Sequence, residues 1–219
     1  MEQDKKDVLE VPDEAKYFTK ISAEDREKVK EWLKNQESYN KEEQDFLYCV
    51  KIAVRIINYD FWIATLEPSV ANGKIYYAEG EPVATGFSGN QYKRMAEEYA
   101  PYRGSRMAKL HELFLWYALR IANGLWTLDD LVKNPLNTER AWEMLNTPVR
   151  LEKTGAKECG GYRDGQRNTY KMVTYGNGVV RVGGDDYHIG ECYTIAEVEY
   201  CYDPNYIGCC GSGVLVLTK

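Results

Sequence analysis

The most strongly apolar segment of the chain lies at its centre and spans Ser105–Leu125. On a helical wheel its apolar side chains cover most of the circumference, which leaves a narrow polar stripe that includes Glu112 and Arg120. A helix that is apolar on nearly all sides must be enclosed by other elements. Ser105 is a good N-cap, and Asn123-Gly124 can end the helix with a residue in the left-handed conformation. The pattern therefore predicts a central core helix.

The same periodicity predicts helices on both sides of this segment. Ser22 begins one, because an acid stands at its third helical position. A second, nearly buried helix runs from Lys41 to about Tyr59, and we expect it to pack against the central helix. Ser88 caps a third helix that ends before Pro101. Two short helices are expected after the central one.

Two parts of the chain have the patterns of β-structure. Residues 61–88 predict a small antiparallel element of two or three strands, turned at Asn72-Gly73. After Pro148 the helical periodicity ends, and glycine, tyrosine and valine become frequent. The strands expected there are Thr169–Tyr175, Val179–Val182, Ile195–Tyr202 and Val214–Thr218, with a hairpin turn at Gly176-Asn177-Gly178.

Together these patterns predict an α+β fold, with helical N-terminal two-thirds, a small β-hairpin insertion and an antiparallel β-rich C-terminal third. Residues 1–18 are predicted to form a disordered acidic tail. Residues 19–147 form the mainly helical region, with its β element at 61–88. Residues 148–219 form a Gly- and Tyr-rich β region that we expect to share a core with the helices.

Composition and charge narrow the classes of partner. The chain has 219 residues, of which 44% are hydrophobic and 28% charged, as in ordinary globular proteins. Its net charge of −6 argues against direct binding of nucleic acid and suits a partner with a basic surface. The N-terminus has no apolar leader and no segment has the length of a membrane span, so we expect a cytoplasmic protein without membrane contact.

One group of residues in the β region could carry out cysteine chemistry. His188 lies in a loop-like segment close to Asp186 and Cys192, and Cys159 precedes it. A cysteine hydrolase or transferase needs a thiolate, an imidazole within hydrogen-bond reach and a group that orients the ring. Under this alternative Cys159 or Cys192 is the nucleophile, His188 the base and Asp185 or Asp186 the orienting acid. No signature of a cysteine-enzyme family accompanies them.

Neither a metal nor a cofactor is expected from the motifs. The cluster around His188 lacks paired ligands at zinc spacing, and the Gly-rich segments lack the strand-to-helix order of a phosphate loop. His111 precedes Glu112, but Leu115 stands where a zinc protease has its second histidine. We therefore interpret His111 as a buried neutral histidine. The cysteines 159, 192, 201, 209 and 210 are expected to be free thiols, with disulfides or metal ligation as alternatives.

Aromatic residues mark the candidate binding surface. The chain has 18 tyrosines, and eight of them fall between Tyr162 and Tyr206. Tyrosine offers a large, rigid contact area with a polar tip, although it also packs on half-buried sheet faces. Trp116 falls in the polar stripe of the central helix, so either another element covers it or it faces a partner. The candidate binding residues are Trp116, Tyr162, Tyr170, Tyr187, Tyr202 and Tyr206.

These observations favour a non-enzymatic binding protein that recognises another protein through a tyrosine-rich β surface. Its acidity makes a basic protein the expected partner, including a nucleic-acid-handling enzyme that an inhibitor of phage or mobile-element type would block. The alternatives are the cysteine-dependent enzyme that uses His188 and a carbohydrate or small-ligand binding module.

Overall fold

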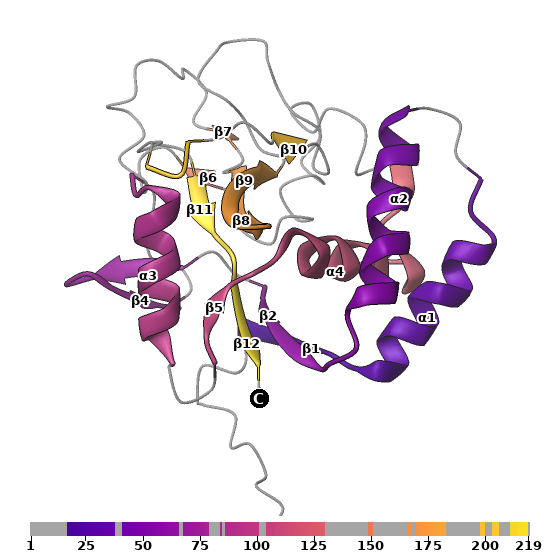
Figure 1. The fold of residues 1–219 in the computed structure, drawn as a ribbon, viewed down its shortest axis with the longest axis horizontal. Coiled ribbons are helices and arrows are strands. Elements are labelled where there is room, and N and C mark those ends of the chain that lie inside the picture. Colours follow the sequence, from indigo (N-terminus) through magenta and orange to yellow (C-terminus); the bar gives the residue numbers. More distant parts are fainter. Residues whose placement is uncertain are drawn as a thin grey trace, which may run out of the picture.

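The computed structural model describes residues 17–37, 41–65, 68–78, 84, 86–100, 104–129, 149–150, 166–167, 170–182, 198–199, 203–205 and 211–218. These residues form helices and mostly antiparallel strands, which confirms the predicted α+β fold (Figure 1). No helix in this part of the chain is long and apolar enough to cross a membrane.

The described helices are α1 (Ala23–Lys34), α2 (Lys41–Ile56), α3 (Gly89–Tyr99) and α4 (Leu110–Ala122). The predicted caps of α1 and α3 are confirmed. Ser22 and Ser88 each accept a hydrogen bond from the N–H of the third helical residue, Asp25 or Gln91. The side chains of Asp25 and Gln91 in turn accept from the N–H of the capping serine. These helix starts are therefore specified by four consecutive residues.

The central helix α4 is shorter than predicted at its N-terminal end. It begins at Leu110, and Arg106–Met107 form the short strand β5 instead. The prediction that Ser105 caps the helix is wrong, because its hydroxyl accepts a hydrogen bond of 2.7 Å from the N–H of Ala100. The predicted end of the helix is confirmed, since Gly124 has a φ of 72°.

Most of the strands belong to two four-stranded sheets. The order in the first sheet is β1 (Phe18–Ile21), β2 (Phe61–Ala64), β12 (Leu215–Thr218) and β5. The order in the second sheet is β10 (Val198–Glu199), β9 (Gly178–Val182), β8 (Tyr170–Tyr175) and β11 (Gly211–Gly213). Two pairs stand apart, β3 (Ser69–Ala71) with β4 (Lys74–Tyr76) and β6 (Val149–Arg150) with β7 (Gln166–Arg167). Every described strand pair is antiparallel except β8 with β11.

The last strands of the chain join the two sheets. β11 pairs with β8 in the second sheet, and β12 follows after one residue and lies between β2 and β5 in the first. That one residue is Val214, whose carbonyl accepts a hydrogen bond of 2.7 Å from the N–H of Ala108. The C-terminal segment therefore connects the second sheet to strands of the first sheet that lie more than a hundred residues earlier in the sequence (Figure 1).

The β element predicted over residues 61–88 is only partly correct. Asn72 and Gly73 form the predicted turn with φ values of 52° and 73°, and they join β3 to β4. The first strand of the predicted element, β2, does not join this hairpin and pairs with β1 and β12. A strand such as β2, which runs Phe-Trp-Ile-Ala and is buried at three of its four positions, needs a partner on each side.

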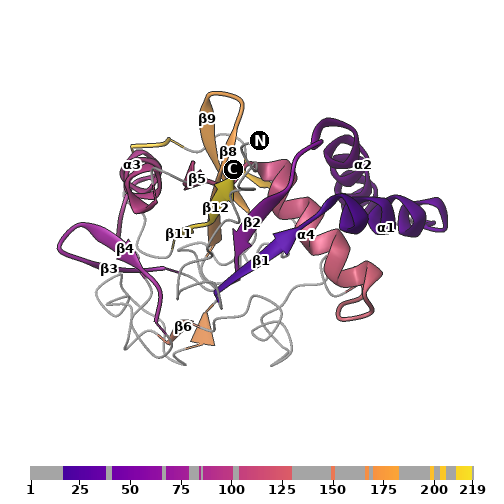
Figure 2. The same cartoon turned by 90° about the horizontal axis from the view of Figure 1, so that it is seen from below.

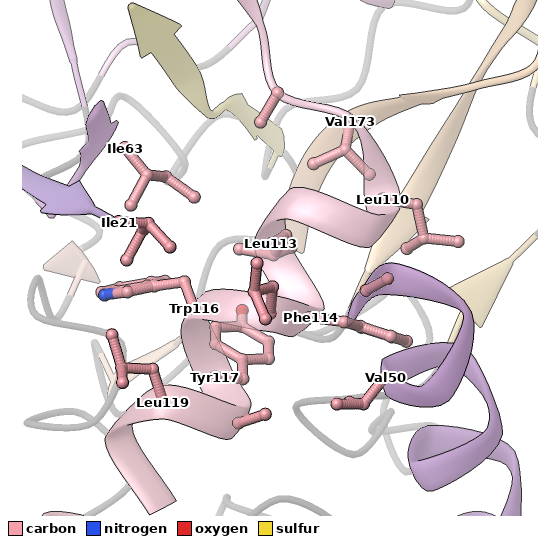
Figure 3. Close-up of a cluster of buried hydrophobic side chains, with 14 of the residues drawn as sticks. Ile21, Val50, Ile63, Leu110, Leu113, Phe114, Trp116, Tyr117, Leu119 and Val173 are labelled. Atoms are coloured by element: carbon pink, nitrogen blue, oxygen red, sulfur yellow. The ribbon is translucent and has the colours of Figure 1, made fainter. Parts of the chain in front are cut away.

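Two apolar clusters cover opposite faces of the strands. Neighbouring residues of one strand belong to different clusters, as Met172 and Val173 of β8 do. Leu215 and Val216 of β12 repeat this alternation. The cluster that contains Val173 and Val216 is built around α4, with α1 and α2 packed on it (Figure 3). The other cluster lies under α3 and β4.

Each of the two clusters contains residues of the helical region together with residues of the C-terminal β region. Tyr17, which the prediction places in the acidic tail, is 8% exposed, and β1 begins at the next residue. Residues 1–16 of the predicted tail lie outside the described residues, as do the second of the short helices expected after α4 and residues 147–148 at the predicted boundary of the β region.

Candidate functional site

Most of the predicted site residues lie outside the part of the chain that the structure describes. Among the candidates for cysteine chemistry these are His188, Cys159, Cys192, Asp185 and Asp186. Among the candidate binding tyrosines they are Tyr162, Tyr187, Tyr202 and Tyr206. Tyr170 is described by its backbone, which begins β8 beside Gly211 of β11. The cysteine-enzyme hypothesis therefore remains a prediction.

Trp116 is buried, with 5% of its surface exposed. Its ring lies 6.1 Å from the ring of Trp126, centroid to centroid, and 5.4 Å from the guanidinium carbon of Arg120. Figure 3 shows the indole on the side of α4 that faces Ile21 and Ile63 of the first sheet. Of the two explanations offered by the sequence, the structure supports the first: other elements cover the Trp116 indole. The covering elements are the strands β1 and β2 and the side chain of Trp126. The indole is not displayed on the surface.

A buried ionic cluster lies at the N-terminal end of α4. Glu112 has no exposed surface, and both of its carboxylate oxygens accept hydrogen bonds from Arg106. The Tyr59 hydroxyl donates to Oε1 at 2.7 Å, and the backbone N–H of Lys109 donates to Oε2 at 2.7 Å. Burial raises the pKa of Tyr59, and the Glu112 charge raises it further, so the phenol stays protonated and donates.

This cluster connects three elements rather than offering a reactive group. Arg106 comes from β5, Tyr59 from the segment before β2, and Glu112 from α4. The carboxylate already accepts from four donors, so its oxygens are saturated. On the helical wheel Glu112 belongs to the narrow polar stripe of the central helix. The spacing of residues on α4 gave no sign of these partners, because Arg106 and Tyr59 lie on other elements.

The β8–β9 hairpin displays an aromatic side chain next to this end of α4. Gly176, with a φ of 58°, makes the turn, and Tyr175 before it is 46% exposed. Figure 2 shows the turn of this hairpin at the edge of the fold. The backbone N–H of Thr174 donates to the carbonyl of Ala108 at 2.8 Å. The hairpin is therefore anchored on the segment that leads into α4, and Tyr175 is held on a rigid support.

The rings of Tyr175 and His111 lie 5.9 Å apart, centroid to centroid. Burial lowers the pKa of His111, which favours the neutral imidazole, but the side chain is only partly buried and not fully buried as the sequence predicts. Lys109 is exposed, and its Nζ lies 5.7 Å from the centre of the Tyr59 ring. We call Tyr59, Lys109, His111 and Tyr175 the α4 N-terminal surface. It combines aromatic rings and an ammonium group, which suits contact with another molecule.

No known protein family model, curated protein or solved structure matches the chain. Any function must therefore be argued from the arrangement of its own side chains. Within the described ranges, no three His, Cys, Asp or Glu side chains lie together in a group that could hold a metal ion.

Proposed function

We propose that this protein acts by binding another protein, and that the α4 N-terminal surface makes part of the contact. The observation that carries the proposal is the exposure of Tyr175, 46%, on an anchored hairpin. Among the tyrosines of the C-terminal β region, Tyr175 is the one whose side chain is described. It is displayed, as a recognition surface requires, instead of filling the core.

The rigidity of the support favours binding. β8 and β9 pair at five positions, and Thr174 forms a bridge with Lys109 next to the start of α4. An aromatic ring on such a support loses little conformational entropy when a partner covers it. The neighbouring ring of His111 restricts Tyr175 further. Aromatic anchors of this kind account for much of the binding free energy in protein interfaces.

The charge of the whole chain suggests the type of partner. At a net charge of −6 the protein as a whole attracts a partner whose surface is mainly basic. Enzymes that handle nucleic acids carry such surfaces, because they bind phosphate backbones. An inhibitor of one of these enzymes is the specific form of the proposal.

Site-specific photocrosslinking tests the proposal. A benzophenone amino acid replaces Tyr175 in one sample and Tyr48 in a control, because Tyr48 of α2 is also exposed, at 65%. Each labelled protein is mixed with cell lysate at a low and at a high salt concentration. We expect one protein to crosslink at position 175 and not at 48, with less product as the salt concentration rises. Equal products at both positions, or none at 175 at any salt concentration, would refute the proposal.

A further inference from the structure

The opposite end of α4 holds an arginine that packs against two tryptophans, whose ring centres lie 6.1 Å apart. The guanidinium carbon of Arg120 lies 5.4 Å from the ring centre of Trp116 and 4.7 Å from that of Trp126. The turn after α4 brings Trp126 there. Gly124 in the left-handed conformation donates to Ile121, and the N–H of Leu125 donates to the carbonyl of Arg120 at 2.9 Å. This is a Schellman turn, which reverses the chain against the last turn of the helix.

Arg120 lacks the kind of acceptors that Arg106 and Arg26 have among the described residues. Arg106 binds both carboxylate oxygens of Glu112, and Arg26 donates to Asp60. The Nε of Arg120 is buried, and no group in the described part of the chain accepts from it. Burial lowers the pKa of Arg120, and the interaction with Tyr117 opposes this shift only in part.

Tyr117, three residues before Arg120 on α4, carries a second buried polar group without a described partner. The hydroxyl of Tyr117 is buried and has no hydrogen-bond partner among the described residues. Its ring lies 5.3 Å from the ring of Trp126, and the charge of Arg120 acts on it. Buried polar groups without partners are uncommon in folded proteins, and two of them within four residues need an explanation.

We propose that Arg120 is a recognition site for the carboxylate of an acidic side chain on a partner protein. The two indoles restrict the planar guanidinium, so less entropy is lost when its remaining N–H groups bind a carboxylate in the forked geometry. Leu125, which is 56% exposed in the same turn, adds an apolar contact beside the charge. The partner segment therefore carries an acidic residue next to an apolar one.

This site lies away from the α4 N-terminal surface, so it goes beyond the function proposed above. His111 and Arg120 are nine residues apart on one helix, which separates them by about 14 Å along the axis and places them on opposite sides. Loss of binding at one site therefore leaves the other intact, and the two proposals can fail independently.

Peptide titration followed by NMR tests the site. The probes are the capped tripeptides acetyl-Leu-Glu-Leu-amide and acetyl-Leu-Gln-Leu-amide, and the signals are the Arg120 Nε–H and the indole N–H groups of Trp116 and Trp126. We expect the Glu peptide to shift these signals to saturation and the Gln peptide to leave them unchanged. Arg120→Lys keeps the charge but loses the fork, so binding should weaken about tenfold or more, the loss of one charge-assisted hydrogen bond.

Matched controls separate local binding from general effects. Arg55→Lys alters an exposed arginine of α2, and Tyr175→Ser alters the other surface, so both variants should bind the Glu peptide like wild type. Far-UV circular dichroism checks the fold of Arg120→Lys; if that variant is unfolded, the comparison of the two peptides on the wild type still decides. Equal shifts from both peptides, no shift at the highest soluble concentration, or larger shifts from inorganic phosphate at equal ionic strength would overturn the proposal.

Discussion

The buried ion pair of Arg106 and Glu112 predicts a strong coupling between two substitutions. Glu112 has no exposed surface, whereas 25% of the Arg106 side chain is exposed. Removing either partner leaves the other charge buried without its counter-ion. We therefore expect Glu112→Leu and Arg106→Met each to lower the free energy of unfolding by about 3–5 kcal/mol. The loss should be larger for Arg106→Met, because the carboxylate it leaves behind cannot turn towards water.

The double variant should be far more stable than the sum of these losses implies. It contains neither charge, so the desolvation penalty disappears with the ion pair. What it lacks is an acceptor for the Tyr59 hydroxyl and for the backbone N–H of Lys109. Tyr59 is partly exposed and its hydroxyl can bind water, so we expect a remaining loss of about 1–3 kcal/mol. The single losses sum to about 6–10 kcal/mol, so the coupling should exceed about 3 kcal/mol.

Urea denaturation of the four proteins measures this coupling. Far-UV circular dichroism and tryptophan fluorescence should give coincident transitions, which establishes two-state unfolding. Glu112→Gln supplies a milder variant, since its amide oxygen can still accept from Tyr59, and it should lose less than Glu112→Leu. Losses that add to within about 0.5 kcal/mol would refute the reasoning, because they would show that the two charges do not depend on each other.

Three further substitutions give distinct results. Gly124→Ala places a Cβ where no atom lies within 4 Å, so the loss should come from the left-handed φ of 72° alone, about 1–2 kcal/mol by urea denaturation, and an unchanged midpoint would contradict this. Because burial lowers the pKa of His111 below 6.5, the unfolded chain binds the proton first, and wild-type stability should fall as the pH drops below 6.5. His111→Gln should remove that part of the pH dependence, as thermal unfolding at pH 8 and pH 5.5 will show. Burial opposes ionisation of Asp60, but hydrogen bonds from Lys20 and Arg26 lower its pKa below 3.8. The stability advantage of wild type over Asp60→Asn should therefore hold above about pH 4 and shrink as the pH falls below it, whereas a constant difference would exclude the ion pairs as its source.

Features specified by neighbouring residues were predictable from the chain alone. The capping boxes at Ser22 and Ser88 involve donors and acceptors three residues apart. The turns at Asn72-Gly73 and Gly176 require left-handed backbone that glycine and asparagine adopt most easily. Gly124 ends α4 for the same reason. Each of these signals lies within about six residues, so sequence order and spatial contact coincide.

The candidate site could be predicted only in part. The chain indicated that its β region displays tyrosines, and Tyr175 is displayed, but it was not among the residues chosen. Glu112 and Arg120 belong to one polar stripe on the helical wheel, yet Glu112 is buried in an ion pair and Arg120 packs against two indoles. A helical wheel shows which residues share a face, and it does not show which elements cover that face.

Pairing between distant segments is what the tertiary structure added. β1 was missed because it is four residues long and depends on β2, about forty residues later. Arg106–Met107 have an apolar helical pattern around them, yet they pair with β12 at the end of the chain. The local sequence does not decide between helix and strand for such short segments. The hydrogen bonds to a pairing strand decide it. The local pattern thus determines where turns and helix ends occur. Long-range hydrogen bonds and burial determine which segments form strands and which charged side chains are buried.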